Sequence, residues 1–398
     1  MKAEQFSNVL NDLDDGIIEE TGKLRETRKR RGGTWKRWAT AAACLCVAAA
    51  AALVTLPWLA QNNPDPTPTA PVHVDPELRP IQLPNFRGGG FGFEGIMLYD
   101  ISELGGLSPW NESMELTALP VYENGSYNIA GESVGLDEGA ILERLEAAAR
   151  ALGAENFTDT EYQYSVTATG TGPVSYITAR ADGMKITAYA DGKVEISFDA
   201  ALPLPEGYRF TDNATDEEAE AVLDYLAGRF SGLLGFSRPQ FALSGEYFFS
   251  GEFHRIDAVY DGGDSVEAIL NYSFRQAEFI SDNNGNLRMI RLTDNLACAR
   301  ELGNYPIITA DEARTLLLNG SYFTSAPYEM PGEDYVAGVE LAYRNSKADE
   351  YLLPYYRFYV ELPEAARDNG LKTYGVYYVP AVQGRYIADM PVYDGHFN

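Results

Sequence analysis

The sequence predicts an α+β fold, in which one transmembrane helix precedes an extracytoplasmic domain of two or three modules, each a helix with an antiparallel sheet. Three observations predict it. An uncharged run lies near the N-terminus, a proline-rich segment follows, and helix patterns then alternate with strand patterns. The 398 residues exceed one ordinary domain, and a hydrophobic fraction of 45% is ample for folded cores.

Residues 1–37 are expected to form a cytoplasmic segment with a short amphipathic helix and a basic cluster. Apolar residues at three- and four-residue spacing share one narrow helical stripe, formed by Phe6, Val9, Leu10, Leu13 and Ile17. Nothing else in so short a segment covers this stripe. We interpret it either as a helix that binds an unknown protein partner through residues 1–22, or as a frayed acidic tail.

Residues 38–60 are predicted to form a transmembrane helix. The run from Ala39 to Ala60 carries no charge and would span roughly 33 Å as a helix, enough for the core of a bilayer. Basic and aromatic residues of the kind found at membrane interfaces flank it, namely Arg30, Arg31, Trp35, Lys36, Arg37, Trp38 and Trp58.

The excess of bases before this run predicts a cytoplasmic N-terminus and an extracellular C-terminal domain. A cleaved signal peptide is disfavoured, because the basic region is long and Trp58 stands where a cleavage site requires a small residue. We therefore expect an uncleaved signal anchor, and so a single-pass protein of the cell membrane.

A proline-rich linker is expected at 61–86, where seven prolines in 24 residues favour a stiff, extended spacer. The first ectodomain module, 87–205, is predicted to contain a helix at about 137–152. Four strands follow it in the prediction, at 162–168, 175–180, 185–190 and 194–198.

The second module, 206–300, should contain a helix starting at Thr215, with Glu218 as its capping-box partner, and strands at about 254–260, 265–281 and 287–293. The third, 301–398, repeats this pattern. Its helix begins at Thr309 with Glu312 as partner, and its strands are expected at 336–344, 352–361 and 374–382.

Charge and cysteine content restrict the partners. The chain has 58 acidic and 31 basic residues, so its formal net charge is −27, and nucleic acid is excluded as the main partner because phosphate binding needs a basic face. Only three cysteines occur, which leaves no disulfide framework. An acidic, cysteine-poor ectodomain suits the surface of a Gram-positive bacterium.

Catalytic motifs find little support. Gly131-Glu-Ser-Val-Gly135 matches the Gly-x-Ser-x-Gly of a nucleophile elbow, but only His254 and His396 follow it, and the segment fits a loop that enters the first helix. Three scattered histidines and Cys298 supply no metal spacing. We therefore predict no catalytic, cofactor-binding or metal-binding residues, no cofactor, and a protein that is not an enzyme.

Four segments of the C-terminal third carry a family resemblance: Thr309-Ala-Asp-Glu-Ala-Arg, Val339-Glu-Leu-Ala-Tyr, Leu353-Pro-Tyr-Tyr-Arg-Phe-Tyr-Val and Tyr377-Tyr-Val-Pro-Ala-Val. Their order resembles uncharacterised single-pass, membrane-anchored surface proteins of clostridia. The same third is similar to the PepSY-like regulators of the cell-wall histidine kinase in Firmicutes. This resemblance implies binding and signalling, and it carries over no active-site residue.

Together these features predict a non-catalytic, membrane-anchored extracytoplasmic binding and regulatory protein of a Gram-positive bacterium. It would couple an envelope ligand, a cell-wall component or a peptide, to a cytoplasmic or membrane partner. One alternative is a tethered cell-envelope hydrolase that uses acidic residues. Another is a structural cell-wall-binding protein that uses its tyrosines, thirteen of which follow residue 320.

Overall fold

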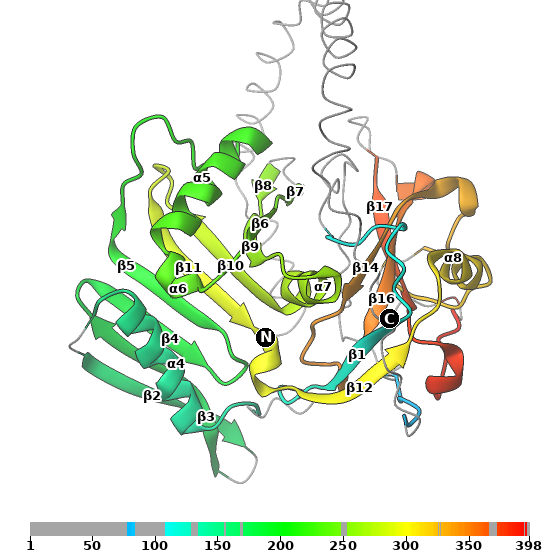
Figure 1. Cartoon of the computed structure of the whole chain (residues 1–398), viewed down its shortest axis with the longest axis horizontal. Coiled ribbons are helices and arrows are strands. Elements are labelled where there is room, and N and C mark those ends of the chain that lie inside the picture. The colour runs from blue at the N-terminus through cyan, green and yellow to red at the C-terminus, as the bar shows by residue number, and fades with distance from the viewer. Residues whose placement is uncertain are drawn as a thin grey trace, which may run out of the picture. The chain divides into compact units, whose positions relative to one another are not determined.

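Antiparallel strands make up most of the regular structure (Figure 1). This computed structural model describes residues 78–83, 108–128, 134–154, 157–167, 170–247, 253–324, 326, 328–365, 372–393 and 395. Within these ranges there are seventeen strands and five α-helices. The predicted cytoplasmic segment, the predicted transmembrane helix and the predicted membrane-interface residues lie outside the described residues.

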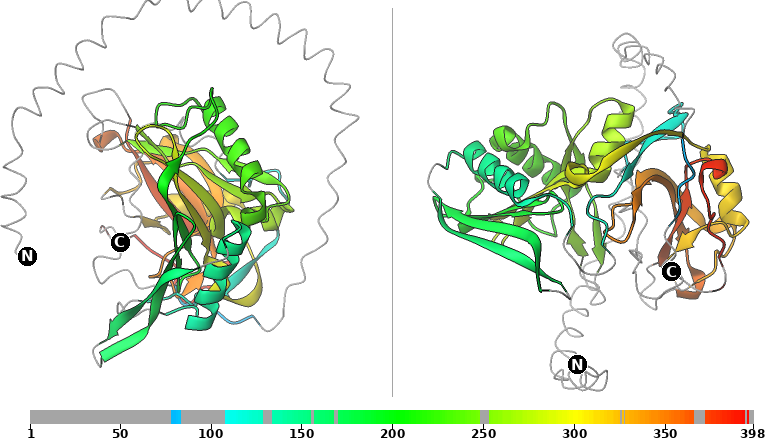
Figure 2. Two further views of the ribbon diagram at one scale, coloured as in Figure 1. Left: turned by 90° about the vertical axis from the view of Figure 1, so that its left-hand side faces the viewer. Right: turned by 90° about the horizontal axis from the view of Figure 1, so that it is seen from below.

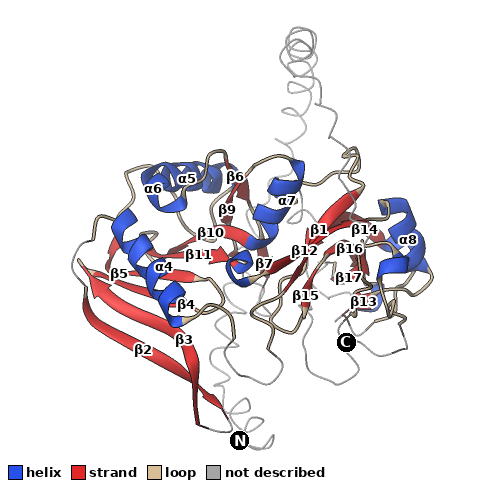
Figure 3. Cartoon of the chain, turned by 60° about the horizontal axis from the view of Figure 1, so that its bottom comes forward, coloured by secondary structure: helices blue, strands red, loops and turns tan. Residues whose placement is uncertain are grey.

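The largest sheet has eight strands, all antiparallel, in the order β2-β3-β4-β5-β11-β10-β9-β6. The strand bounds are β2 Thr158–Thr167, β3 Gly170–Ala181, β4 Met184–Tyr189, β5 Val194–Leu202, β6 Pro239–Ala242, β9 Ala258–Asp261, β10 Arg275–Ser281 and β11 Leu287–Asp294. Helices α4 (Glu138–Ala151), α5 (Asp216–Arg229) and the short α6 (Ser231–Leu234) lie over one face of this sheet (Figure 3).

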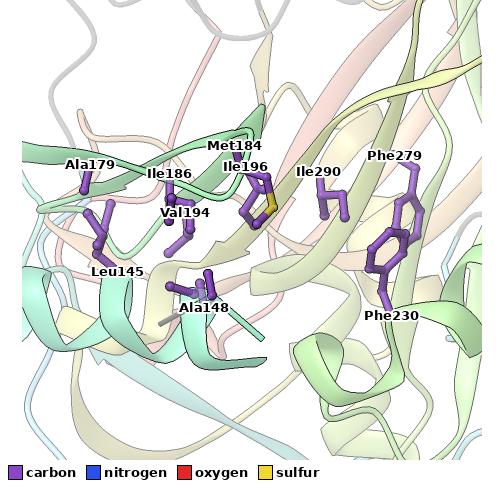
Figure 4. Close-up of a cluster of buried hydrophobic side chains, with 14 of the residues drawn as sticks. Leu145, Ala148, Ala179, Met184, Ile186, Val194, Ile196, Phe230, Phe279 and Ile290 are labelled. Carbon is purple, nitrogen blue, oxygen red and sulfur yellow. The ribbon is translucent and has the colours of Figure 1, made fainter. Parts of the chain in front are cut away.

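The core of this region lies between those helices and the sheet. Leu145 and Ala148 of α4 point toward Ile186 and Val194 of the strands (Figure 4). The ring of Phe230, at the end of α5, lies 6.0 Å from that of Phe279 on β10. Because side chains alternate along a strand, core residues recur at every second position, as Ile177, Ala179 and Ala181 do on β3.

Side-chain caps explain where the helices begin. Asp137 accepts a hydrogen bond from the Ala140 amide at the start of α4. Thr215 and Glu218 form the predicted capping box of α5. Thr309 and Glu312 form the predicted box of α8 (Ala310–Leu318). Each cap satisfies amides that the first helical turn leaves without partners.

The C-terminal third contains a four-stranded sheet in the order β13-β17-β16-β14, in which the bounds are β13 Phe323–Thr324, β14 Val336–Tyr343, β16 Pro354–Glu361 and β17 Tyr374–Pro380. Core residues cover both faces of β16 and β17. Phe358 and Tyr377 join one cluster with α8, whereas Tyr355 and Tyr378 join another with Ile81.

A three-stranded sheet, β12-β1-β15, contains β1 (Ala118–Glu123), β12 (Arg300–Pro306) and β15 (Tyr351–Leu352). Strand β12 follows directly on β11 of the large sheet, with one short 3-10 turn between them. Helix α7 (Ser265–Phe274) packs on β14, where the Tyr343 amide donates to Ser273 Oγ at 3.1 Å.

The fold-class prediction requires correction. The described part of the chain is mostly β, with large antiparallel sheets, instead of a balanced set of helix-plus-sheet modules. The predicted transmembrane helix also finds no support, because none of the helices in the described ranges is long and apolar enough to cross a membrane. The segment to which it was assigned, 38–60, is outside those ranges.

Three further predictions differ from the structure. The segment 265–281 was expected to be one strand, but its first ten residues form α7 and only 275–281 form β10. Part of the expected spacer belongs to the core, because Ile81 and Leu83 are buried and Ile81 bridges to Ile387. The eight-stranded sheet also contains strands from both sides of the module boundary expected near 205.

Candidate functional site

A bent hairpin forms one wall of the candidate site. Strands β6 and β9 continue into β7 (Gly245–Tyr247) and β8 (Phe253–Arg255), which form a separate two-stranded sheet. At the break, the Ser244 amide donates to the Asp257 carboxylate at 3.1 Å, and the Ile256 amide donates to the Ser244 carbonyl at 2.8 Å. Here the hairpin leaves the large sheet, and β8 does not pair with β10.

A mostly buried arginine holds the departing strand. Arg255 donates through Nε to Asp257 at 2.7 Å and through Nη2 to Asp216 at 3.0 Å, and its backbone amide donates to Asp212 at 3.0 Å. The side chains of Arg255 and Asp257 are only 10% and 11% exposed. These bonds fix β8 against the start of α5, because leaving either charge unpaired there would be costly.

Burial shifts the pKa values of this pair. Burial raises the pKa of Asp257, and the nearby Arg255 guanidinium offsets that rise only in part. Burial alone would lower the pKa of Arg255, but the carboxylates of Asp257 and Asp216 outweigh it, and the pKa is raised. Arg255 therefore stays charged and acts as a structural cation.

Between β8 and β10 lies a cleft of about 960 Å³. The segment 209–214 before α5, the bend at 254–257 and the end of β10 at 278–283 line it, together with Met289 and Arg291 of β11. This volume lies in the range of ligand pockets, which is roughly 300–1,000 Å³.

Most charged groups of the lining are held in ion pairs. Arg291 contacts Glu278 at 2.7 Å and Glu195 at 3.1 Å, and Arg209 contacts Glu218 at 3.3 Å. Hydrogen bonds from the Asn286 backbone and side chain hold the pKa of Asp282 low. Such pairs give the cleft a fixed pattern of donors and acceptors that can orient a polar ligand.

Apolar side chains line the rest of the cleft. Leu223 and Phe279 are buried in its floor, whereas Ile256 stands at the bend and is 44% exposed. Exposed apolar groups of this size lose contact with water when a ligand covers them, and that burial is favourable. The cleft thus combines an apolar floor with oriented charges.

One histidine lies in the cleft. His254 Nδ1 is 3.2 Å from a carboxylate oxygen of Asp212, and both side chains are about half exposed. Asp212 also accepts from the Arg255 amide, which fixes the carboxylate. A carboxylate in this position orients an imidazole through its Nδ1 atom.

The structure brings together few of the residues that the sequence singled out. His254 lines the cleft, whereas residues 131–133 of the Gly-x-Ser-x-Gly match lie outside the described residues. Cys298 is partly buried. Across the described part of the chain, no group of three or more histidine, cysteine, aspartate or glutamate side chains could hold a metal ion.

Most of the C-terminal tyrosines are core residues, although Tyr335 is 38% exposed. Six of those with strand-like spacing are buried: Tyr343, Tyr355, Tyr356, Tyr359, Tyr377 and Tyr378. By contrast, sequence inspection missed the cleft. The ion pair at its wall joins Arg255, at the end of β8, to Asp257 in the bend between β8 and β9.

Comparisons with known proteins do not assign a family. No protein-family model matches the sequence, and no curated protein matches it either. One solved structure with some similarity is an uncharacterised protein from Eubacterium rectale. It is 10% identical, with a TM-score of 0.32, and the match covers 70% of this chain and 87% of that protein.

Proposed function

We propose that this protein binds a peptide ligand in the cleft between β8 and β10, without catalysis. The observation that carries the proposal is the combination of an apolar floor with charges already held in ion pairs. Arg255 and Arg291 stay charged beside neighbouring carboxylates, so they can orient a polar ligand but do not act as general acids or bases. A peptide offers the matching chemistry, since it carries amide donors and acceptors beside apolar side chains.

Two points stay predictions from the sequence. One is that residues 1–22 transmit binding to a partner, and the other is that the cleft is extracellular. Both concern segments outside the described residues. The cleft itself is a property of 209–291 and can be tested independently of them.

The test uses the full-length chain and a library of soluble hexapeptides. A peptide that binds the native state raises the unfolding temperature, and mass spectrometry shows whether it is recovered intact. We expect stabilisation by a subset of peptides, all recovered uncleaved. The Ile256→Lys variant should lose this effect, because a lysine at the bend introduces a charge over the apolar floor.

Val166→Lys is the matched control. Val166 lies on β2, away from the cleft lining, and is 86% exposed, so this change places the same charge on an exposed apolar position elsewhere. It should bind peptides as the parent chain does. Equal stabilisation of the parent and the Ile256→Lys variant would show that peptides bind elsewhere, and no stabilisation of the parent would refute peptide binding.

Hydrolysis of the bound ligand is a second candidate function, favoured by the contact between His254 and Asp212 inside the cleft. A carboxylate-oriented imidazole is a common general base. Cleaved peptides in the same assay, with cleavage abolished in His254→Gln, would establish this function in place of simple binding.

A further inference from the structure

The departure of the hairpin leaves one side of β10 without a strand neighbour. Strand β9 pairs with β10 only over Gln276–Glu278, opposite Ala258–Tyr260. Beyond Glu278 no other described strand lies on that side of β10. We call Phe279–Ser281 the free edge of β10.

The free edge faces the cleft and not a packed neighbour. Phe279, Ile280 and Ser281 all line the cleft, and Arg255–Asp257 line the opposite wall. The other edge of β10 is occupied by β11, because Phe279 pairs with Ile290 and Ile280 pairs with Met289. Along a strand, backbone groups point alternately to the two edges, so only part of those in Phe279–Ser281 bond to β11. Within the described residues, no strand pairs with the remaining groups on the side of the cleft, where an N–H or C=O without a partner is a ready hydrogen-bonding site.

The two walls of the cleft differ in whether their backbone groups already have hydrogen-bond partners. The backbone of β8 that would continue the line of β9 is already committed, since the Arg255 amide donates to Asp212. The Arg255 side chain holds β8 in that position through Asp257 and Asp216. The hairpin is thus held away from the place that a straight β9 would fill.

We propose that the ligand is an extended polypeptide segment that adds to the free edge of β10 as a strand. This inference rests on the proposed function and specifies how the cleft is used. Main-chain hydrogen bonds to Phe279–Ser281 would supply affinity, and alternate side chains would supply specificity. Only about three residues of the ligand can pair in this way, since β9 occupies the rest of that side.

The residues around the free edge indicate which side chains the ligand segment carries on each face. Phe279 belongs to the core face of the sheet with Leu223, so ligand side chains on that face contact apolar surface. The neighbouring Glu278 and Ile280 lie on the opposite face, because direction alternates along a strand. Ligand side chains on that second face meet charged groups.

The charge near the cleft is acidic. Four acids line it against three arginines: Asp212, Asp257, Glu278 and Asp282 against Arg209, Arg255 and Arg291. Helix α5 begins beside it with three more acids, Asp216, Glu217 and Glu218. Charge complementarity therefore favours a segment in which apolar residues alternate with basic ones.

The experiment uses the full-length chain and a six-residue peptide of alternating lysine and valine with blocked ends. Two isomers accompany it, one N-methylated at every valine and one at every lysine. Along a strand, alternate amides point to opposite edges, so each isomer loses the donors of one edge only. Side chains and net charge are the same in all three peptides.

Strand addition predicts that one isomer binds roughly tenfold more weakly than the parent peptide, because it loses one or two hydrogen bonds, while the other isomer binds normally. Hydrogen exchange should slow, when the parent peptide binds, at those amides of Phe279–Ser281 that point away from β11. Ile256→Lys should abolish binding, and Val166→Lys should leave it unchanged.

Three outcomes overturn the inference. If both isomers bind as the parent does, yet Ile256→Lys abolishes binding, the cleft binds peptides without strand addition, and the proposed function survives alone. Equal weakening of both isomers also contradicts a single paired edge. If the alternating peptide fails to bind while other hexapeptides bind the cleft, the assignment to alternating apolar and basic segments is wrong.

Discussion

The outer strand β2 of the eight-stranded sheet and strand β17 of the C-terminal sheet use tyrosine in opposite ways. Strand β2 exposes Tyr162 and Tyr164 beside acids and threonines, whereas β17 buries Tyr374, Tyr377 and Tyr378. The helices lie over one face of the eight-stranded sheet, and the β2–β3 end of that sheet extends away from the rest (Figure 2). Strands β16 and β17 are covered on both faces.

This difference shows that the pattern of apolar residues in a strand depends on whether one or both of its faces are buried. A strand with one solvated face alternates between apolar and polar residues, whereas a strand buried on both faces becomes a continuous apolar run. The same difference separates a region that packing closes from the region in which we propose a binding site. The C-terminal sheet is closed by packing, while the larger sheet keeps an edge, a cleft and oriented charges.

The largest expected effect compares one tyrosine from each sheet. Tyr377→Ala removes a fully buried ring whose hydroxyl donates to the Tyr328 carbonyl at 2.8 Å, and it should lower the free energy of unfolding by about 3–5 kcal/mol. Tyr164→Ala, at a position that is 41% exposed, should change it by less than about 0.5 kcal/mol. Urea titration of both variants measures the contrast, and equal losses would contradict it.

The next comparison concerns ion pairs. Arg344 and Asp349 contact each other at 2.6 Å and are 3% and 2% exposed, so Asp349→Ala should cost about 3 kcal/mol by leaving a buried charge. Arg180 and Asp199 are half exposed, and Asp199→Ala should cost less than about 1 kcal/mol.

A double variant sharpens this comparison. Replacing Arg344 by Met together with Asp349 by Leu removes both buried charges, so it should recover most of the loss seen in Asp349→Ala. Urea titration again gives the values. If the double variant is as unstable as the single one, the loss does not come from an unpaired buried charge. The Arg344–Asp349 pair then makes a net contribution to the free energy of unfolding.

The smallest expected effect is a pH dependence of the larger sheet. Burial tends to raise the pKa of Glu195, but hydrogen bonds from Tyr189 and Arg291 outweigh it and hold the pKa below its ordinary value of 4.5. A lowered pKa in the folded state adds stability above about pH 4.5, and this stability is lost as pH falls through the folded-state pKa.

Glu195→Gln should therefore lose less stability than the parent chain when the pH is lowered from 7 to 3. Unfolding temperatures measured across this interval test it. Glu220→Gln, on the exposed side of α5, is the control and should follow the parent chain. Identical pH profiles of the parent and Glu195→Gln would contradict the proposed role of the Tyr189 and Arg291 bonds.

Local signals in the sequence were enough to locate several elements. Thr215 with Glu218 and Thr309 with Glu312 marked two helix starts correctly, because a capping box involves only residues three apart. The third box, Asp264 with Glu267, carried the same signal for α7. It was outweighed by the apolar and aromatic residues that follow, which suit a strand and a buried helix equally.

Sheet order and the cleft depended on contacts that no local pattern contains. Strand β5 pairs with β11 across about ninety residues of intervening chain, and this pairing places the segment before α5 near the end of β10. The bend of the hairpin depends on Arg255 reaching Asp216, 39 residues away in sequence. Such partners are set by tertiary packing.

By itself, then, the sequence determined helix caps, strand alternation and the acidic character of the chain, since each depends on neighbours within a few residues or on composition alone. The tertiary structure decided which strands share a sheet, that the C-terminal tyrosines are buried, and that β10 keeps a free edge. The physical reason is that burial and strand pairing are properties of surfaces brought together by folding, whereas propensity and capping act within a single turn or strand.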